Sequence, residues 1–375
     1  MERKRVPLGN YITEYSVRNR SGEDIPVYSV TNSQGFCTEY FDKEVASKDK
    51  TTYKIVPRGY FAYNPSRINV GSVDWQRCEG RVIVSPLYNV FSVSEKMEQQ
   101  YLFYFLKSNV GRQMIKAKAS GSVRDNLKMD MLKEMTIPER TIEEQKKCVA
   151  TLDALKTIIS LWEKELEKLD ELIKARFVEL FGDPRSNPFG FEKKMLKDTC
   201  KVITGNTPSR AIAEYYGDYI EWIKTDNIVS GILNPTQATE SLSEKGMNVG
   251  RTVEKDSILM ACIAGSIASI GRVCITDRTV AFNQQINAVV PEQYNILFLY
   301  VLLQMSKDYL VEDINMALKG ILSKSKLEEK EFIIPPMDLQ EQFSDFVKQV
   351  DKSKVIDINI ILKGGVYNGN EFFVS

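Results

Sequence analysis

Residues 141–184 read TIEEQKKCVATLDALKTIISLWEKELEKLDELIKARFVELFGDP, and this stretch decides how the chain is organised. Its apolar residues recur in alternating steps of three and four, which is typical of the a/d seam of a coiled coil rather than the wider face of a globular helix. The seam comprises Leu152, Leu155, Ile159, Trp162, Leu166, Leu169 and Ile173. We therefore expect a long helix whose apolar stripe packs against a second helix or another subunit.

Both ends of this helix carry chemical signals. Thr141 followed by Glu144 is a capping box, in which each side chain bonds the backbone N–H of the other. Gly182 and Pro184 end the helix, because glycine suits the left-handed C′ position and proline cannot continue the hydrogen-bond ladder. About 40 residues at about 1.5 Å each predict a rod roughly 60 Å long.

Composition predicts two domains on either side of this rod. A chain of 375 residues with 43% hydrophobic residues has enough apolar material for two cores. Its six cysteines are scattered without a CxxC pair, which indicates reduced thiols in a cytoplasmic protein rather than disulfides or a zinc knuckle. No signal peptide or membrane span is expected, since the longest apolar run, 257–271, is too short to cross a bilayer.

Charge and residue types narrow the function classes. The chain contains no histidine, which excludes Ser-His-Asp and Cys-His nucleophilic sites and histidine-containing metal sites. Fifty basic and fifty acidic residues give zero net charge, which argues against a strongly electrostatic DNA binder of the histone type. Zero net charge does not exclude local basic surfaces, because many of the acidic residues are concentrated in the central helix.

The two flanking segments follow one plan. Each shows β-rich runs separated by turn residues, then a helix, a basic loop and an Ile-Pro pair. The expected helices lie at about 97–118 and 293–313, and the Ile-Pro pairs at 137–138 and 334–335. The predicted fold class is mixed α/β (α+β), with two similar domains separated by long helices that form an antiparallel coiled coil.

Three landmarks repeat at one offset. Pro138 aligns with Pro335 (335 − 138 = 197), residues 141–145 align with 338–342, and residues 56–61 align with 253–258. Three matches at one offset favour an internal duplication. Two unrelated α/β domains are the alternative.

The second copy of the long helix is expected to be short. Helical spacing persists from 338 to about Lys354, and a β-branched, Gly/Asn-rich tail follows. A C-terminal strand with a loose end is one interpretation, and a helix cut short and replaced by unrelated sequence is the other. The predicted boundaries are 1–140 and 185–337 for the two domains, 141–184 and 338–354 for the helices, and 355–375 for the tail.

Catalytic motifs are not found. Residues 205–209 (GNTPS) only superficially suggest a phosphate-binding loop, and there is no GxSxG elbow. Residues 63–66 (YNPS) are faintly similar to an amino-methyltransferase site but lack its second proline and aromatic residue, so a turn is favoured. We expect no catalytic residue, metal or cofactor in this chain.

Binding is the function that remains. Each half carries basic residues interleaved with Ser, Asn and Gly before its Ile-Pro pair, a composition suited to phosphate and base-edge contacts. An ordinary solvated loop is the alternative for each. The candidate DNA-binding residues are Asn64, Ser66, Arg67, Arg124 and Lys128 in the first half, and Thr207, Ser209, Arg210, Lys224, Lys319 and Lys324 in the second.

Several stretches of this sequence share a familiar pattern. They are the two Ile-Pro pairs with the residues 142–145 and 339–342 that follow them, and residues 81–88, 179–184, 205–209, 222–228 and 283–288. In these stretches the chain resembles the specificity (S) subunits of Type I restriction-modification systems. The resemblance implies two target-recognition domains, each reading half of a bipartite double-stranded DNA sequence in the major groove, and an antiparallel helical spacer. A coiled-coil scaffold and a stand-alone DNA-modifying enzyme are the alternatives.

The resemblance also implies partners. Two methyltransferase (modification) subunits would dock on the chain with S-adenosylmethionine and methylate a flipped adenine. Restriction subunits that use ATP and Mg²⁺ would join them. A second helix ending near Lys354 departs from the family pattern, and it predicts an uncovered seam from about Ile159 to Leu180 or cover by a second S-type chain.

Overall fold

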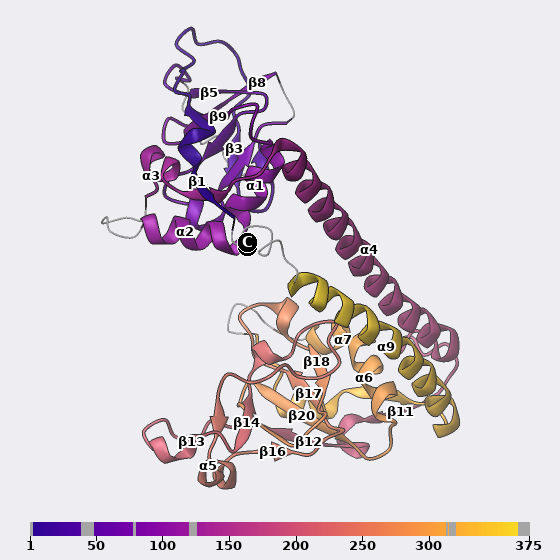
Figure 1. Ribbon diagram of the computed structural model, residues 1–375. Helices are drawn as coiled ribbons and strands as arrows, with labels where there is room; N and C mark the ends of the chain where they lie inside the picture. The colour runs from indigo at the N-terminus through magenta and orange to yellow at the C-terminus, as the bar shows by residue number, and fades with distance from the viewer. Residues whose placement is uncertain are drawn as a thin grey trace. The chain divides into compact units, whose positions relative to one another are not determined.

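The computed structural model describes residues 3–38, 49–77, 80–119, 126–312, 314 and 320–366, with residues 355–366 described by their backbone alone (Figure 1). The chain divides into two compact units. The first lies before Glu163 and takes in the described residues from Asn359, and the second is Glu163–Ile358. Both units mix helices and short strands, so the predicted fold class is confirmed.

A four-stranded antiparallel sheet forms the centre of the first unit. Its order is β2 (Ile12–Glu14), β9 (Asn89–Val93), β6 (Phe61–Tyr63), β7 (Val73–Trp75). Phe61 and Phe91 stack at 4.9 Å between ring centroids and pack with buried residues of α1. The remaining elements are β1 (Arg5–Pro7) paired with β10 (Thr136–Pro138), β3 (Ser29–Thr31) with β4 (Gly35–Cys37), β5 (Lys54–Pro57) with β8 (Arg81–Val84), and the helices α1 (Gln99–Lys107), α2 (Asn109–Ala119) and α3 (Met129–Lys133).

The single helix expected at 97–118 is two helices. Ser108 has an extended backbone (φ −66°, ψ 160°) that ends α1, and its hydroxyl accepts a hydrogen bond from the N–H of Gly111 (3.1 Å). Serine favours such capping positions because its side chain replaces a missing backbone partner. Lys116 and Lys118 lie in the last turn of α2.

The second unit has a similar central sheet. Its order is β12 (Cys200–Thr204), β20 (Ile286–Pro291), β17 (Ile258–Ala261), β18 (Val273–Ile275), with all neighbours antiparallel. The nearly uninterrupted apolar helix α6 (Ile296–Met305) is largely buried in this unit's main core. The other elements are β13 (Tyr216–Gly217), β15 (Ser241–Leu242), β14 (Ile220–Ile223), β19 (Val280–Phe282) and β16 (Thr252–Val253) in a second sheet, β11 (Glu192–Met195) paired with β21 (Glu331–Ile334), and the helices α5 (Glu244–Val249), α7 (Lys307–Val311) and α8 (Lys324–Glu329).

The internal duplication is confirmed by strand order. The sheet β2-β9-β6-β7 corresponds to β12-β20-β17-β18, with β6 and β17 beginning at residues 61 and 258 (258 − 61 = 197). The helices α1 and α6 begin at residues 99 and 296, again 197 apart (296 − 99). Within residues 253–275, β17 and β18 form an antiparallel hairpin.

A buried glutamine in each copy shows that this offset is different at the start of the long helices. The Gln145 side chain accepts a hydrogen bond from the N–H of Glu98 (2.9 Å) and donates one to the Arg140 carbonyl (3.0 Å). The Gln340 side chain accepts from the N–H of Asn295 (2.9 Å) and donates to the Pro335 carbonyl (2.8 Å). Glu98 and Asn295 are the N-caps of α1 and α6.

These two residues, which we call the anchoring glutamines, are therefore equivalent at an offset of 195 (340 − 145). The predicted match of residues 141–145 with 338–342 placed Gln342 opposite Gln145 and is wrong by two residues. The offset has already changed before the Ile-Pro pairs, because the N–H of Leu8 donates to the Met135 carbonyl and that of Leu196 donates to the Lys330 carbonyl (330 − 135 = 195). Pro138 pairs with Arg5, and Ile333, 195 residues later, pairs with Lys193, so the predicted match of Pro138 with Pro335 is also wrong by two residues. Buried apolar residues agree with the new offset, since Cys148 and Leu152 correspond to Phe343 and Val347.

The first long helix, α4 (Ile142–Phe181), has the length and the start that the sequence predicted. The hydroxyl of Thr141 accepts from the N–H of Glu144 (3.2 Å), and the Glu144 carboxylate accepts from the N–H of Thr141 (2.9 Å). The capping box is confirmed. The second long helix, α9 (Met337–Val366), starts differently, because the Pro336 carbonyl accepts the first bonds and Asp338 already lies in the first turn.

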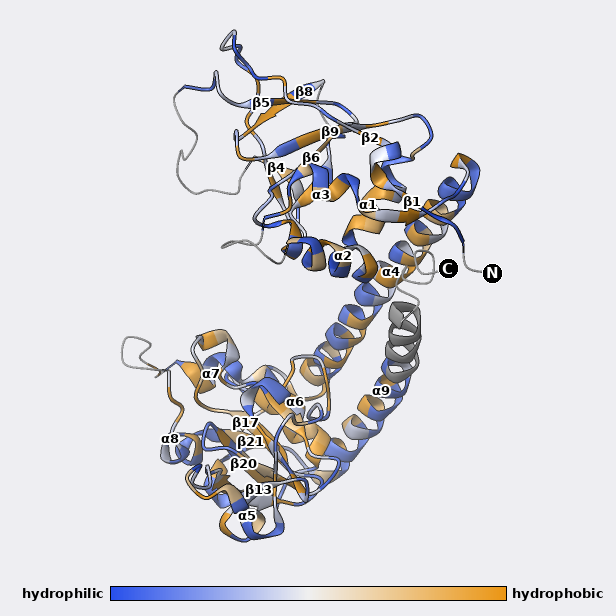
Figure 2. Ribbon diagram, turned by 60° about the vertical axis from the view of Figure 1, so that its left-hand side comes forward, coloured by the Kyte–Doolittle hydropathy of each residue, from blue (hydrophilic) through white to orange (hydrophobic). Residues whose placement is uncertain are grey.

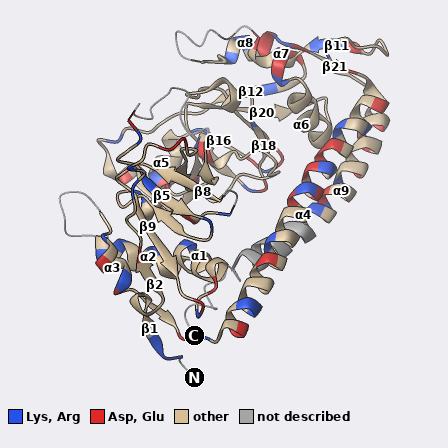
Figure 3. Ribbon diagram, turned by 90° about the horizontal axis from the view of Figure 1, so that it is seen from above, with Lys and Arg blue, Asp and Glu red and all other residues tan. Residues whose placement is uncertain are grey.

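The predicted seam is the least exposed stripe of α4. Leu152 and Ile173 are buried, and the other five seam residues are half-buried. Hydrophilic and hydrophobic residues alternate along α4 and α9 in Figure 2, and acidic and basic residues are interspersed along α4 in Figure 3. Such a charged outer face is expected for a solvated helix with one packed stripe.

The end of α4 packs against the start of α9. Phe343 of α9 meets Phe177 and Phe181 of α4 with ring centroids 5.5 and 5.6 Å apart. Farther along α9, the Lys354 ammonium lies 2.6 Å from the Asp170 carboxylate. Contact of a later α9 residue with an earlier α4 residue makes the pair antiparallel, as predicted.

Two predictions about the second helix need correction. It runs to Val366 rather than ending near Lys354, although at 30 residues it is shorter than the 40 of α4. The seam from Leu169 onward, expected to lack cover, packs in one core with Phe343, Val347 and Val350. Because α9 is antiparallel to α4, the start of α9 packs against the end of α4, and a short α9 covers that end. The tail beyond Val366 lies outside the described residues.

Candidate nucleic-acid interface

One edge of the second unit's central sheet gathers polar loops. β12 and β17 end there and β20 and β18 begin there, because neighbouring strands are antiparallel. We call residues 205–210, 224–227, 262–272, 283–285 and 320–324 at this edge the second loop surface. Loops at the end of a rigid sheet are a common place for binding residues.

Backbone and side-chain hydrogen bonds connect these loops. The N–H of Asn283 donates to the Ile223 carbonyl (3.0 Å), and the Arg272 guanidinium donates to the Thr225 carbonyl (3.2 Å). The N–H of Leu322 donates to the Cys262 carbonyl (2.8 Å). These hydrogen bonds hold the loops together as one continuous surface.

Gly205 allows two of these loops to approach closely. A Cβ atom at this position would lie 2.1 Å from the Asn283 carbonyl oxygen and 2.5 Å from that of Phe282. We expect Gly205→Ala to lower the free energy of unfolding by about 1–3 kcal/mol, as overpacking against backbone does. Urea denaturation of the purified protein would measure this.

Gly265 on the same surface provides the control. No atom lies within 4 Å of a Cβ atom built there. Gly265→Ala is expected to change the free energy of unfolding by no more than about 0.5 kcal/mol. If both alanine variants lost the same free energy of unfolding, the close approach of the two loops would not be the reason for a glycine at position 205.

A charged cluster centred on Glu240 dominates one side of this surface. Its carboxylate accepts hydrogen bonds from Arg210 (2.6 Å) and Lys224 (2.6 Å). The Arg210 guanidinium lies 4.4 Å from the Tyr216 ring centroid and 5.3 Å from that of Trp222. Hydrogen bonds from Lys224 and then Arg210 lower the pKa of Glu240, so the carboxylate is charged at neutral pH.

The two aromatic rings are themselves fixed to the loop that carries Arg210. The Trp222 indole N–H donates to the Asn206 carbonyl (3.2 Å), and the Tyr216 hydroxyl donates to the Pro208 carbonyl (2.7 Å). The Thr207 hydroxyl contacts the Gln284 side chain from the neighbouring loop. Trp222 is buried.

The first unit has an equivalent edge. The N–H of Leu127 donates to the Pro65 carbonyl (3.1 Å), which matches the Leu322–Cys262 bond of the second unit (262 − 65 = 197; 322 − 127 = 195). We call residues 64–72 and 126–128 the first loop surface. The side-chain oxygen Oδ1 of Asn64 accepts from the N–H of Ser66 (3.1 Å), which makes the turn expected from residues 63–66.

The structure brings most predicted DNA-binding residues to these two surfaces. Asn64, Ser66, Arg67 and Lys128 lie on the first, where Ser66, Arg67 and Lys128 are exposed. Thr207, Ser209, Arg210, Lys224 and Lys324 lie on the second. Lys324 begins α8 and lies 3.5 Å from Glu328, so it is on a helix rather than in the loop expected. Arg124 and Lys319 lie outside the described residues.

Sequence reasoning missed Glu240, Tyr216 and Gln284. Glu240 and Tyr216 stand in no basic or motif-like stretch, and they join the surface only through pairing of β13, β14 and β15. Gln284 lay within the 283–288 stretch that carried the family resemblance. It could have been included as a polar residue between two strands.

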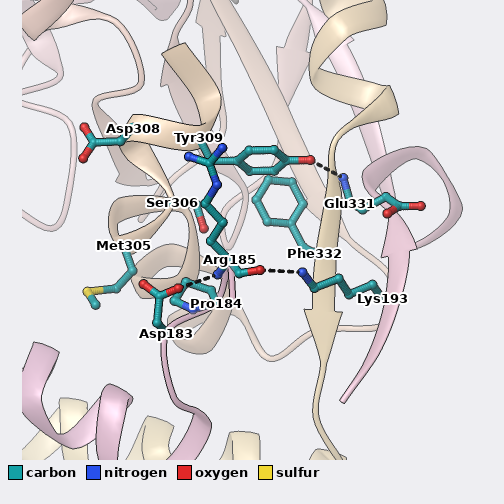
Figure 4. A pocket seen from close by; sticks show the side chains of 10 residues that line it. All are labelled: Asp183, Pro184, Arg185, Lys193, Met305, Ser306, Asp308, Tyr309, Glu331 and Phe332. Carbon is teal, nitrogen blue, oxygen red and sulfur yellow. Dashed lines mark hydrogen bonds between the residues drawn. The ribbon is translucent and has the colours of Figure 1, made fainter. Parts of the chain in front are cut away.

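A separate polar pocket lies beside the end of α4 (Figure 4). Its cavity of about 250 Å³ is lined by Asp183, Pro184, Arg185, Lys193, Met305, Ser306, Asp308, Tyr309, Glu331 and Phe332. The Arg185 guanidinium is paired with Glu312 (2.7 Å), and Lys193 donates to the Arg185 carbonyl (2.8 Å). These contacts fix the turn after α4 against α7 and the β11–β21 pair.

The buried thiols have no nucleophilic character. Burial raises the pKa values of Cys200, Cys262 and Cys274 to about 12, so these thiols stay protonated at neutral pH. Within the described residues, no three Cys, Asp or Glu side chains are grouped to hold a metal ion. No helix among those residues is both long and apolar enough to cross a membrane.

Comparison with known proteins explains the duplication. The model of the Type I restriction modification DNA specificity domain matches residues 8–171 and again residues 188–361. The chain belongs to this family. The two matches coincide with the two copies of the sheet-helix-helix plan, so each copy is one DNA specificity domain.

Two curated relatives in the DNA specificity family are similar over part of their length. The Type I restriction enzyme HindI specificity subunit from Haemophilus influenzae is 33% identical over 175 residues, covering 41% of this chain and 37% of that protein. The MjaIX specificity subunit from Methanocaldococcus jannaschii is 26% identical over 272 residues, covering 66% of this chain and 61% of that protein. The chain thus aligns with less than two thirds of either relative.

Solved structures share the fold of this DNA specificity protein. A chain from a structural study of complex assembly and conformational transition in the type I R-M system superposes with a TM-score of 0.61 at 15% identity, covering 98% of this chain and 96% of that one. The S subunit of a Type I restriction-modification system from M. genitalium gives a TM-score of 0.52 at 14% identity, covering 98% and 94%. At these identities the likeness shows the fold alone.

Proposed function

We propose that this chain is the DNA-recognition subunit of a Type I restriction-modification complex and that each unit reads one half of a bipartite target. The observation that carries the proposal is the pair of DNA specificity domains whose equivalent sheet edges hold polar and basic loops. Phosphate contacts from exposed lysines and arginines would position each surface, and polar side chains would read base edges in the major groove.

Chemistry is proposed to reside on partner subunits. Two methyltransferase subunits would carry S-adenosylmethionine, and restriction subunits would carry ATP and Mg²⁺. The chain itself would contribute sequence selection. The protonated buried thiols and the absence of histidine from the sequence support this division of labour. We place the complex in the cytoplasm, where its DNA substrate lies and where scattered thiols stay reduced.

Exchange of one domain tests the proposal. Residues 1–140 or residues 190–335 would be replaced by the matching segment of a relative with a different target, and the hybrid would be expressed with its methyltransferase. We expect each exchange to change one half of the methylated sequence and leave the other half unaltered. Sequencing of modified bases across the genome gives the readout.

The two hybrids serve as controls for one another. If a single exchange altered both halves of the methylated sequence, independent reading by the two units would be wrong. If neither exchange altered it, the chain would be a scaffold for a complex whose specificity lies elsewhere.

A further inference from the structure

We infer that Arg210 reads a guanine in the half-site of the second unit and that Glu240 is the positioning residue that aims it. The inference rests on the proposed function and names the residue that gives it base specificity. It begins from the Glu240 cluster on the second loop surface.

The Arg210 guanidinium is held on two sides and open on others. One N–H donates to Glu240 (2.6 Å), and the group lies over the Tyr216 and Trp222 rings. Its side chain is nevertheless 57% exposed. A guanidinium has five N–H donors in a rigid plane, so donors remain available after the bond to Glu240. Such a planar fork matches the O6 and N7 acceptors of guanine.

The carboxylate indicates a base rather than a phosphate as the ligand. Glu240 sits between Arg210 and Lys224 and leaves the three groups with a net charge of only +1. A phosphate-binding site gains from uncompensated positive charge, and an acidic residue there weakens it. A neutral base edge gains instead from fixed donor geometry, which the carboxylate and the two rings supply.

The position agrees with this role. Arg210 follows the loop that leaves β12, and Lys224 follows β14 directly beside Asn283. Both cations therefore stand on the surface formed by the sheet edge and not on a remote face. The rings that hold Arg210 are bonded to its own loop through Asn206 and Pro208.

The test uses the chain in complex with its methyltransferase and a set of duplexes in which each base pair of the target is replaced in turn. For Arg210→Ala, we expect discrimination at one guanine-containing pair of the second half-site to fall roughly 5- to 150-fold, with other positions unchanged. Glu240→Gln should weaken discrimination at that same pair, yet it should raise binding to unrelated DNA because a negative charge is removed. If Glu240 had a purely structural role, its replacement would not weaken discrimination at one base pair and at the same time raise binding to unrelated DNA.

Lys245→Ala is the matched control. Lys245 is an exposed cation of the same unit, and its ammonium lies 2.5 Å from the Glu214 carboxylate. It should leave the preference at every base pair unchanged. If Arg210→Ala weakens binding equally to all duplexes and lowers the salt dependence, Arg210 contacts a phosphate and the inference is wrong. If the unaltered complex shows no preference in the second half-site, the proposed function itself fails.

Discussion

Phe343→Ala is expected to lower the free energy of unfolding of the second unit by about 3–5 kcal/mol, the usual cost of removing a buried phenylalanine. The side chain is fully buried, and its ring lies within 6.4 Å of the rings of Phe177, Phe181 and Phe298 between centroids. Little of this void can close, because aromatic rings on α4 and α6 surround it. Urea denaturation monitored by circular dichroism would measure the loss.

Phe346 on the same helix is the control for this variant. It is only partly buried at the edge of the core, near Arg176 of α4. Phe346→Ala should therefore cost clearly less than Phe343→Ala. Similar losses for the two variants would mean that the packing between the end of α4 and the start of α9 is not as the structure places it.

Gln340→Leu is expected to cost about 2–4 kcal/mol, even though leucine has a similar size. The substitution removes the acceptor for the N–H of Asn295 and the donor to the Pro335 carbonyl, and each buried group left unsatisfied costs about 1–3 kcal/mol. Gln145→Leu should produce the corresponding loss in the first unit. Denaturation of both variants, with fluorescence and circular dichroism, would follow the two losses.

Gln342→Leu distinguishes the two possible alignments of the repeat. Gln342 is exposed, and it is the residue that a constant offset of 197 places opposite Gln145. Its replacement should change the free energy of unfolding by less than about 0.5 kcal/mol. A loss at Gln342 as large as that at Gln340 would restore the constant offset and contradict the anchoring role of Gln340.

Sequence patterns predicted the parts of the fold that local physics determines. The a/d steps of α4, its capping box and the duplication are periodic or chemical signals, and all three were confirmed. The end of α9 was predicted wrongly because β-branched residues and glycines after Lys354 have low intrinsic helix propensity, which is a weak guide to an actual helix end. The two-residue shift was missed because exposed Gln342 and buried Gln340 look alike without burial.

The two loop surfaces were predictable in outline only. Basic and polar residues beside the turns predicted that Arg67, Lys128, Arg210 and Lys224 would belong to them. Their grouping depends on which strands pair and which loops share a sheet edge, and periodicity does not determine that. Glu240 could not be predicted for this reason, since it lies 30 residues after Arg210, whose guanidinium donates a hydrogen bond to it.

The anchoring glutamines have a consequence for inheritance. Each glutamine lies in the first turns of its long helix and is hydrogen-bonded to the domain that precedes that helix. The contacts that fix the domain to its helix are therefore made by residues near the start of the helix. A genetic crossover later in the helical segment would transfer a domain together with its anchoring glutamine. The hydrogen bonds between the two would therefore be kept. Under the proposed function, one such crossover would exchange a whole domain and change one half of the DNA target.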